Sequence, residues 1–307
     1  MSELVKTRSE ILFLYDVTDA NPNGDPIDEN KPRIDEETGI NIVTDVRLKR
    51  TIRDYLHEYK NQDVFIIETR DDKGNLRTKE DRLGDFKTPE DLLDKCIDIR
   101  LFGATTAVEG KTMILTGPVQ FKYGRSLHKV DLTYVKGTTV MPSGAERKQG
   151  TFTEKYILPY SLIAFYGVVN ENAAANQGIR LTEEDILLML EGMWNGTKNL
   201  ISGSKFGQVP RLLMQVIYRE GNLYLGELDK RISLISSKNN DKEIRDITDV
   251  KIDITELINA LLGIKDKVEK IRLKIDERIT FVQDGKEIRL DGPNGVLKDF
   301  QTELLSF

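Results

Sequence analysis

Four basic side chains lie close together in one short segment, where they could bind phosphate groups. They are Arg47, Lys49, Arg50 and Arg53. Apolar residues recur at three- and four-residue steps through residues 44–59, which predicts an amphipathic helix with Thr44 as its N-cap. The cations would lie on the faces that the apolar stripe leaves open. Such a face is either a solvated helix surface or a phosphate site, and this segment alone leaves both interpretations open.

A second candidate phosphate site is the glycine-containing segment 202–211, which precedes a strand expected at 212–218. Glycines allow a backbone to approach a phosphate closely. The polar and basic side chains of this segment are Ser204, Lys205, Gln208 and Arg211. The sequence from residue 198 to residue 219 holds four cations and no acid. The spacing is not that of a Walker loop, and a plain β-turn is the alternative interpretation.

The segment 122–155 is also basic, with seven cations against three carboxylates, in a chain whose net charge is −6. Two strands are expected, at 132–135 and 152–156, joined by a long loop. The residues of interest are Lys122 and Arg125 before the strands, and Met141, Arg147 and Lys148 in the loop. An exposed apolar side chain beside cations could wedge between bases while the cations hold phosphates. A flexible hairpin is the alternative.

The composition of the 307 residues is that of a globular protein with a single cysteine, Cys96. One cysteine excludes an internal disulfide framework and fits the reducing cytoplasm, where we expect the protein to work. No apolar run is long enough for a membrane helix, and no signal-peptide core follows Met1. A non-specific nucleic-acid binder would usually be basic overall, so any nucleic-acid site must be local.

The elements that would position these residues predict an α+β fold. The long elements read strand, helix, strand, strand, helix, strand, which is the ferredoxin-like, RRM-like arrangement. The strands are expected at 9–18, at 112–123 with a break at Gly117-Pro118, at 156–169 and at 212–218. The first helix is expected at 44–59, and the second begins after a capping box at Thr182. We expect one domain with insertions at 60–97 and 130–157. Residues 227–307, including a hairpin at 279–290, would pack on it. The usual RNA-binding aromatic residues are absent from the central strands, so any RNA must lie on helix and loops.

Six motifs occur in this order in one known family. They are Asn21-Pro22-Asn23-Gly24-Asp25-Pro26, the segment 43–50, Arg100-Leu101-Phe102-Gly103, Gly117-Pro118-Val119-Gln120-Phe121, Gly124-Arg125-Ser126-Leu127 and the segment 204–211. On these motifs the chain resembles the backbone RAMP subunit of type I CRISPR effector complexes (Cascade), the seventh Cas family, and most closely its type I-B branch. The resemblance runs from about Ile11 to Tyr218.

This resemblance implies an RRM-like palm with finger and thumb insertions, and no catalytic residue, metal or cofactor. Copies of the chain would stack head to tail along one CRISPR RNA, each holding about six nucleotides and leaving the guide free to pair with target DNA. Other Cascade subunits would be further partners. The resemblance assigns guide phosphates to Arg47, Lys49, Arg50, Arg53, Arg125, Ser126, Ser204, Lys205 and Gln208. We also expect Lys122 and Arg211, which lie in the basic segments, to contact the RNA. It makes Met141 the thumb wedge, with Arg147 and Lys148 beside it.

Two other functions stay open. Related type III subunits cut target RNA with a loop aspartate, and Asp25, Asp28 and Asp35 lie in a suitable loop, where carboxylates could hold Mg²⁺. Against a nuclease, neither His57 nor His128 is placed as a partner base. The second alternative is a protein-only scaffold whose basic face meets an acidic partner.

Overall fold

A central, mostly antiparallel sheet organises the chain in the computed structural model, which describes residues 3–108, 111–138 and 152–307. Its inner strands are β11 (Gln208–Tyr218), β1 (Ser9–Ala20), β10 (Phe152–Val169) and β8 (Gly124–Lys129), adjacent in that order. Helix α1 (Asp45–Lys60) follows β1, and helix α6 (Glu183–Lys198) follows β10. This strand order and helix placement are ferredoxin-like, so the predicted α+β class is confirmed.

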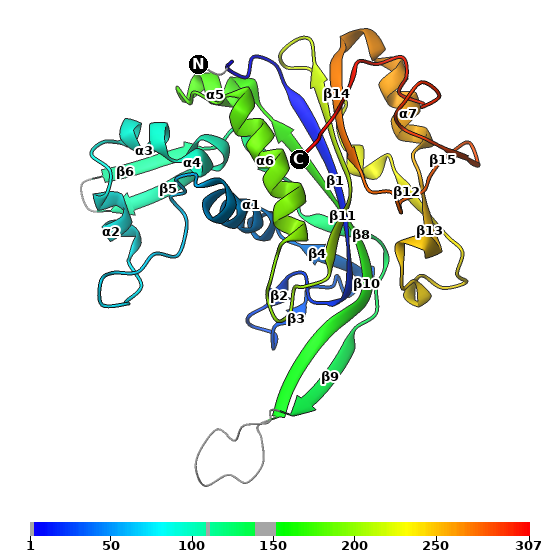
Figure 1. The fold of residues 1–307 in the computed structure, drawn as a ribbon, viewed down its shortest axis with the longest axis horizontal. Helices are drawn as coiled ribbons and strands as arrows, with labels where there is room; N and C mark the ends of the chain where they lie inside the picture. The colour runs from blue at the N-terminus through cyan, green and yellow to red at the C-terminus, as the bar shows by residue number, and fades with distance from the viewer. Residues whose placement is uncertain (1–2, 109–110, 139–151) are drawn as a thin grey trace.

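Strand β1 is buried on both faces because each face of the sheet is covered. Ile11 and Phe13 belong to the core under α1 and α6, whereas Leu12 and Leu14 belong to a second core on the opposite face. That second core is closed by the C-terminal part of the chain (Figure 1). A sheet covered in this way offers no open face for nucleic acid, in agreement with the prediction that RNA lies on helix and loops.

The C-terminal part adds strands at one edge of the sheet and a small sheet of its own (Figure 1). Its elements are β12 (Ser233–Ser236), β13 (Val250–Asp253), α7 (Thr255–Gly263), β14 (Val268–Ile275), β15 (Phe281–Gln283), β16 (Lys286–Ile288) and β17 (Thr302–Leu304). The predicted hairpin is present as β15 and β16, and Asp284 and Gly285 at its tip have positive φ, as a type I′ turn requires.

The two predicted helix starts are confirmed. The Thr44 hydroxyl accepts a hydrogen bond from the Arg47 amide at the beginning of α1, and Thr182 forms a capping box with Asp185 at the beginning of α6. Gly196 of α6 lies against the Thr51 carbonyl of α1, where an added Cβ would come within 3.0 Å of that oxygen. This close approach fixes α1, and hence its cations, against α6.

One sequence-based expectation about strands is wrong. The segments 152–156 and 156–169 form the single strand β10, whose pairing with β1 passes the irregular pair Asp19 and Pro159 without ending. The N-terminal end of β10, residues 152–157, pairs with β9 (Thr133–Thr138), and the two strands extend beyond the palm as an arm (Figure 1). The predicted break at Gly117-Pro118 is confirmed, because β6 (Lys111–Thr116) ends there and β7 (Val119–Phe121) pairs with β10.

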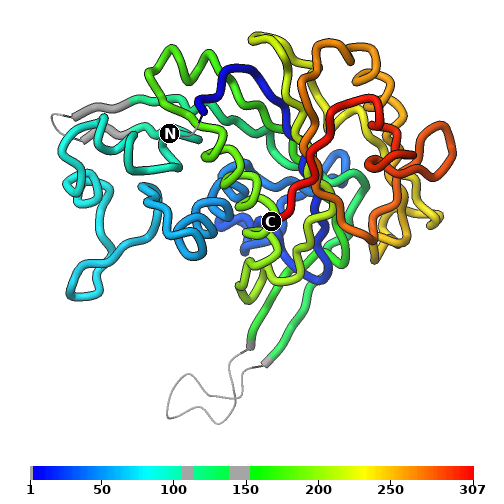
Figure 2. Tube along the Cα trace, turned by 45° about the horizontal axis from the view of Figure 1, so that its top comes forward, coloured from blue at the N-terminus to red at the C-terminus, as the bar shows by residue number. Residues whose placement is uncertain are grey.

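A finger-like excursion follows α1 and leaves the palm on the side opposite the C-terminal part (Figure 2). It contains α2 (Lys79–Gly84), α3 (Pro89–Lys95), α4 (Ile97–Phe102) and the hairpin of β5 (Gly103–Val108) with β6. It therefore continues past the predicted limit at residue 97. The remaining short elements are β2 (Gly24–Asp25), β3 (Lys31–Pro32), β4 (Ile40–Val43) and α5 (Glu171–Asn176).

A buried ion pair joins α1 to this finger. Arg53 Nε lies 2.9 Å from Asp98 Oδ2, and Asp98 also accepts hydrogen bonds from the amides of Phe65 and Ile66. The Asp98 side chain is fully buried. Removing one partner of such a pair leaves a charge in a medium that solvates it poorly.

Replacing Arg53 with alanine is therefore expected to lower the free energy of unfolding by about 3 kcal/mol. Arg50→Ala is the matched control on the same helix, because its pair with Asp54 is exposed to solvent and should contribute about 1 kcal/mol or less. Urea unfolding followed by circular dichroism measures both values. Equal, small losses in the two variants would contradict a structural role for Arg53.

Candidate nucleic-acid interface

One turn, residues 21–23, joins three parts of the chain that are distant in sequence. The Asn21 amide donates to the Ser204 carbonyl at 2.7 Å, so the end of β1 holds the segment 202–207, which we call the glycine loop. Asn23 Oδ1 accepts from both the amide and the hydroxyl of Thr44, at 2.8 and 2.9 Å, and so holds the beginning of α1. Two of the predicted phosphate-binding segments thus meet at this turn. We call the place formed by residues 21–23, 44–47 and 202–208 the junction.

Arg47 and Lys205 carry the unbalanced charge at the junction. Arg47 Nη2 donates to Thr51 Oγ1 at 2.9 Å, and Lys205 Nζ lies 3.4 Å from Ser204 Oγ. Neither cation has an ion-pair partner among the described residues. Burial lowers the pKa of Arg47, whereas burial and then the charge of Arg47 lower the pKa of Lys205. Asp54, which pairs with Arg50, also acts on Arg47, but positive charge remains in excess here, and this excess favours an anion.

Several buried polar atoms at the junction have no hydrogen-bond partner. Four of the eight such side-chain atoms in the described part of the chain belong to junction residues: Asn21 Oδ1, Arg47 Nε, Ser202 Oγ and Gln208 Nε2. Three of them are donors. Because an unsatisfied buried donor costs free energy, a ligand with several acceptor oxygens would be stabilised here. A phosphodiester is such a ligand.

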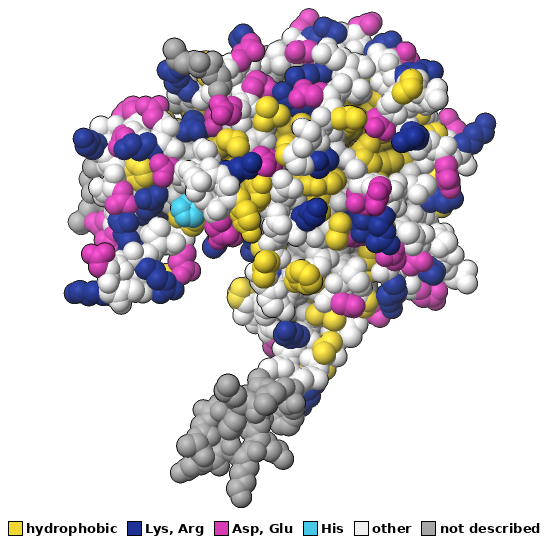
Figure 3. Space-filling model, in the orientation of Figure 1, with side chains coloured by type: hydrophobic (Ala, Val, Ile, Leu, Met, Phe, Trp, Pro, Cys, Tyr) yellow, Lys and Arg dark blue, Asp and Glu magenta, His cyan; other side chains and the backbone are white. Residues whose placement is uncertain are grey.

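Apolar side chains surround these donors and stay exposed to solvent. Ile201 precedes the glycine loop and Phe206 lies within it, with 83% and 72% of their surface exposed. Ile27, between β2 and β3, is 97% exposed. Lys155 of β10 donates to the Gly203 carbonyl at 3.1 Å, which attaches the β9–β10 arm to the same loop. Apolar side chains gather on this face above the start of the arm (Figure 3). Cations with exposed apolar neighbours are the surface that single-stranded nucleic acid binds.

Three other predicted cations are exposed but lie in ion pairs. Arg50 contacts Asp54 at 2.6 Å, on the same helix as Arg47. Arg125 lies 3.5 Å from Asp35 at the β8 edge. Lys122 lies 2.9 Å from Glu227 and over the ring of Tyr166, whose side chain belongs to the core on the C-terminal face. Arg50 is therefore close to the junction along α1, and Lys122 points to a different face of the palm.

Four predicted phosphate contacts require correction because their side chains are buried and bonded inside the protein. They are Lys49, Arg53, Ser126 and Arg211. Lys49 contacts Asp45 and the Phe102 ring, and Arg53 is held by Asp98. The Ser126 hydroxyl accepts from the Asn41 amide and donates to the His128 carbonyl. Arg211 pairs with Asp16 and Asp276 on the C-terminal face of the sheet.

The predicted thumb residues Met141, Arg147 and Lys148 lie outside the described residues. Sequence reasoning missed Asn21, Asn23 and Ser202 as parts of the site, and it gave no role to Ile27, Ile201 or Phe206. The two asparagines belong to the first of the six motifs, but the sequence assigned neither of them a role. Exposed apolar residues in a loop cannot be told from buried ones by pattern alone, because loops lack a regular period.

The carboxylates of the loop after β1 are bound separately rather than gathered. Asp25 pairs with Arg33 at 2.6 Å, Asp28 pairs with Lys31 at 2.7 Å, and Asp35 accepts the amides of Glu37 and Thr38. Within residues 3–108, 111–138 and 152–307, no group of three or more acidic, histidine or cysteine side chains is arranged to hold a metal ion.

His128 is unsuited to act as a base. Its ring is buried against Tyr160, its Nε2 accepts a hydrogen bond from the Leu162 amide, and burial lowers its pKa.

None of the helices among the described residues is long and apolar enough to cross a membrane.

Comparison with known proteins agrees with this fold. The family model described as CRISPR-associated protein Cas7 matches residues 7–255. A protein of Haloferax volcanii named CRISPR-associated protein Cas7 is 33% identical over 316 aligned positions, which cover 92% of this chain and 91% of that protein. The type I-B branch is not tested by these matches and stays a prediction.

Two solved structures share the fold at low sequence identity. One, from a CRISPR RNA-guided surveillance complex, has a TM-score of 0.56 at 14% identity and covers 97% of this chain and 94% of its own. A second, from such a complex described as pre-nicking, has a TM-score of 0.54 at 12% identity, with coverages of 91% and 96%. The match over residues 7–255 and the 33% identical Haloferax relative show that this chain belongs to the Cas7 family of CRISPR-associated proteins.

Proposed function

We propose that this protein is a non-catalytic backbone subunit of a type I CRISPR interference complex and binds the phosphates of the CRISPR RNA at the junction. One observation carries the proposal: the turn at residues 21–23 joins the segments of Arg47 and Lys205, neither of which has an ion-pair partner among the described residues. Arg47 Nε, Ser202 Oγ and Gln208 Nε2 are buried donors there that lack acceptors. A guide phosphate supplies both the negative charge and the acceptor oxygens. Family membership supports the same role.

The exposed apolar residues give the bases a place to stack. Phe206 lies within the glycine loop, Ile201 precedes it and Ile27 lies on the loop that Asn21 anchors, so a strand bound through Arg47 and Lys205 passes beside them. Stacking on apolar surface tolerates any base. Neither the phosphate contacts nor the stacking depends on which base is bound. The target sequence is therefore recognised by the guide, whose base edges stay free to pair with the target DNA strand.

The remaining parts of the proposal concern assembly. Copies of the chain bind head to tail along one RNA, since a heterologous contact that does not close forms an open filament. The β9–β10 arm, which reaches beyond the palm, is suited to contact the next copy (Figure 1). Other subunits of the complex cap the filament, and we place the assembly in the cytoplasm.

The structure favours this function over the two alternatives. A metal-dependent nuclease needs convergent carboxylates, whereas Asp25, Asp28 and Asp35 each have their own partners in this loop. A protein-only scaffold would use the basic face to bind carboxylates. The buried donors and exposed apolar side chains together fit a nucleotide strand better than an acidic peptide, because a strand brings a phosphate and a planar base in each unit.

The double variant Arg47→Ala, Lys205→Ala tests the phosphate contacts. For the wild type, the logarithm of RNA affinity should fall with the logarithm of salt concentration, with a slope of about −0.7 per neutralised phosphate. Because the two cations share one phosphate, the slope of the double variant should be less steep by about 0.7. The double variant should also bind RNA strands of unrelated sequence more weakly, and by a similar factor for each. Fluorescence anisotropy over a salt series measures the slope.

The charge-matched control is Lys251→Ala, Lys286→Ala, two exposed cations of the C-terminal part. It should keep the wild-type slope. If both double variants change the slope equally, the binding comes from overall charge and not from the junction.

The lowered pKa of Lys205 predicts how RNA binding depends on pH. A bound phosphate raises that pKa again, so binding takes up a proton at a pH near the pKa of the free protein, and affinity falls as the pH rises through it. Lys205→Arg should remove this alkaline decline, because arginine stays charged. Titration of alkali-resistant 2′-O-methyl RNA between about pH 7 and about pH 10 measures the difference. An identical decline in the arginine variant would show that another group titrates.

A further inference from the structure

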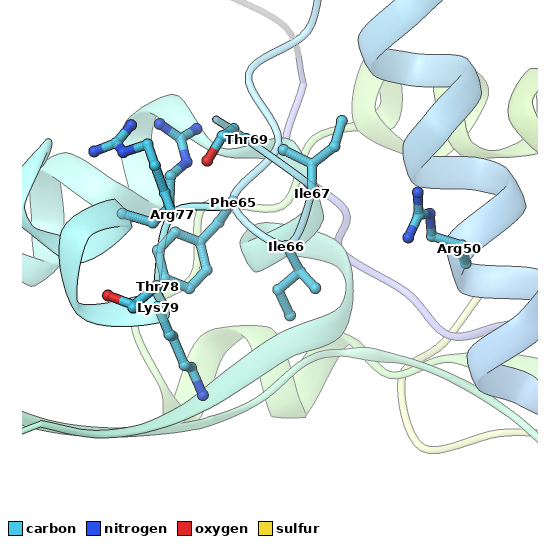
Figure 4. Close-up of a pocket in the computed structure, with 9 residues that line it drawn as sticks. Arg50, Phe65, Ile66, Ile67, Thr69, Arg77, Thr78 and Lys79 are labelled. Carbon is cyan, nitrogen blue, oxygen red and sulfur yellow. The ribbon is translucent and has the colours of Figure 1, made fainter. Parts of the chain in front are cut away.

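A second cavity lies where the finger meets α1, away from the glycine loop. Its volume is about 350 Å³, within the range of small-ligand sites. Side chains from α1 and from the finger line it, among them Arg50, Ile66, Arg77, Lys79 and Arg82. Arg50 reaches from α1 towards a wall of finger side chains (Figure 4). We call this cavity the finger pocket.

The finger pocket carries more positive than negative charge. Arg77 and Arg82 share one carboxylate, Asp85, at 2.7 and 2.8 Å, and Arg50 has Asp54. Hydrogen bonds from Arg77 and Arg82 lower the pKa of Asp85 to about 2, so it stays ionised.

Lys79 donates to the Thr105 carbonyl and has no acidic partner among the described residues. Arg82 Nε is buried without a hydrogen-bond partner within the described ranges. Asp81, which is bonded to Thr78, adds a third carboxylate near Arg77. The four cations still outnumber these carboxylates, which makes this a place for an anion.

The opposite side of the finger pocket is apolar. Ile66 is 42% exposed, although it is a large apolar side chain, and the buried ring of Phe65 lies behind it. Thr69 and Thr78 also line the cavity. A ligand that fits combines a flat apolar body with a negative group at one end. A nucleotide has this chemistry, because its base stacks on apolar surface and its phosphate takes the cations.

Arg50 connects the finger pocket to the junction. It follows Arg47 by three residues on α1, an advance of about 4.5 Å along the helix axis. A strand whose phosphate is bound by Arg47 therefore has its neighbouring nucleotide within reach of Arg50. We propose that the finger pocket receives one nucleotide of the single strand bound at the junction, with the base against Ile66 and the phosphate towards Lys79 and Arg77. This inference rests on the proposed function.

An acidic peptide of another subunit is the competing occupant of the finger pocket. We favour the RNA strand because Arg50 lines the pocket and lies on the same helix as Arg47, so one strand can contact both sites. The two occupants predict different effects of Lys79→Glu on RNA crosslinking.

The test is photocrosslinking with a single-stranded RNA that carries 4-thiouridine, followed by mass spectrometry of the crosslinked peptides. Wild type should crosslink within residues 65–79 as well as within residues 201–208. Lys79→Glu should reduce the crosslinks at 65–79 at least about threefold and leave those at 201–208. Lys73→Glu, an exposed cation on the same finger that does not line the pocket, should reduce neither. Circular dichroism confirms that each variant is folded.

The outcomes separate this inference from the proposed function. Crosslinks at 201–208 without any at 65–79 would overturn the finger pocket as a nucleotide site and leave the junction intact. Absence of crosslinks at both places would overturn both. If Lys79→Glu keeps every RNA crosslink but loses a protein partner from the assembled complex, the occupant is a peptide and the inference is wrong.

Discussion

The hydrogen bonds of the turn at Asn21 and Asn23 are the interaction on which the functional part of this molecule depends. They hold the end of β1, the glycine loop and the first turn of α1 in one place. These contacts oppose the repulsion between Arg47 and Lys205. Neutral backbone and amide contacts thus keep the two cations near each other, and under the proposed function a bound phosphate would relieve this repulsion.

The double covering of the sheet explains why the site lies on helix and loops. Helices α1 and α6 close one face, and the C-terminal part closes the other, where Arg211 joins Asp16 of β1 to Asp276. Nucleic acid can therefore reach only the rim of the palm. At that rim the finger, α1, the glycine loop and the β9–β10 arm surround a concave face (Figure 3).

Local signals in the sequence were sufficient to predict the helix at residues 44–59, the capping box at Thr182 and the turn at Asp284, because each depends on residues a few positions apart. They could not show which cations are free. Arg53 and Arg211 find their carboxylates 45 and 195 residues away, and only folding brings those groups together. Arg47 and Arg53 look alike in the sequence, yet Arg47 lies at the proposed phosphate site and Arg53 lies in a buried ion pair.

The central claim is that this chain binds RNA as a non-cleaving backbone. The most direct measurement mixes the purified protein with a single-stranded RNA of about 40 nucleotides, with and without Mg²⁺, and analyses it by size exclusion and on a denaturing gel. The account predicts that intact RNA elutes together with several protomers in both conditions. RNA cut in the presence of Mg²⁺, or RNA that elutes apart from the protein, would contradict it.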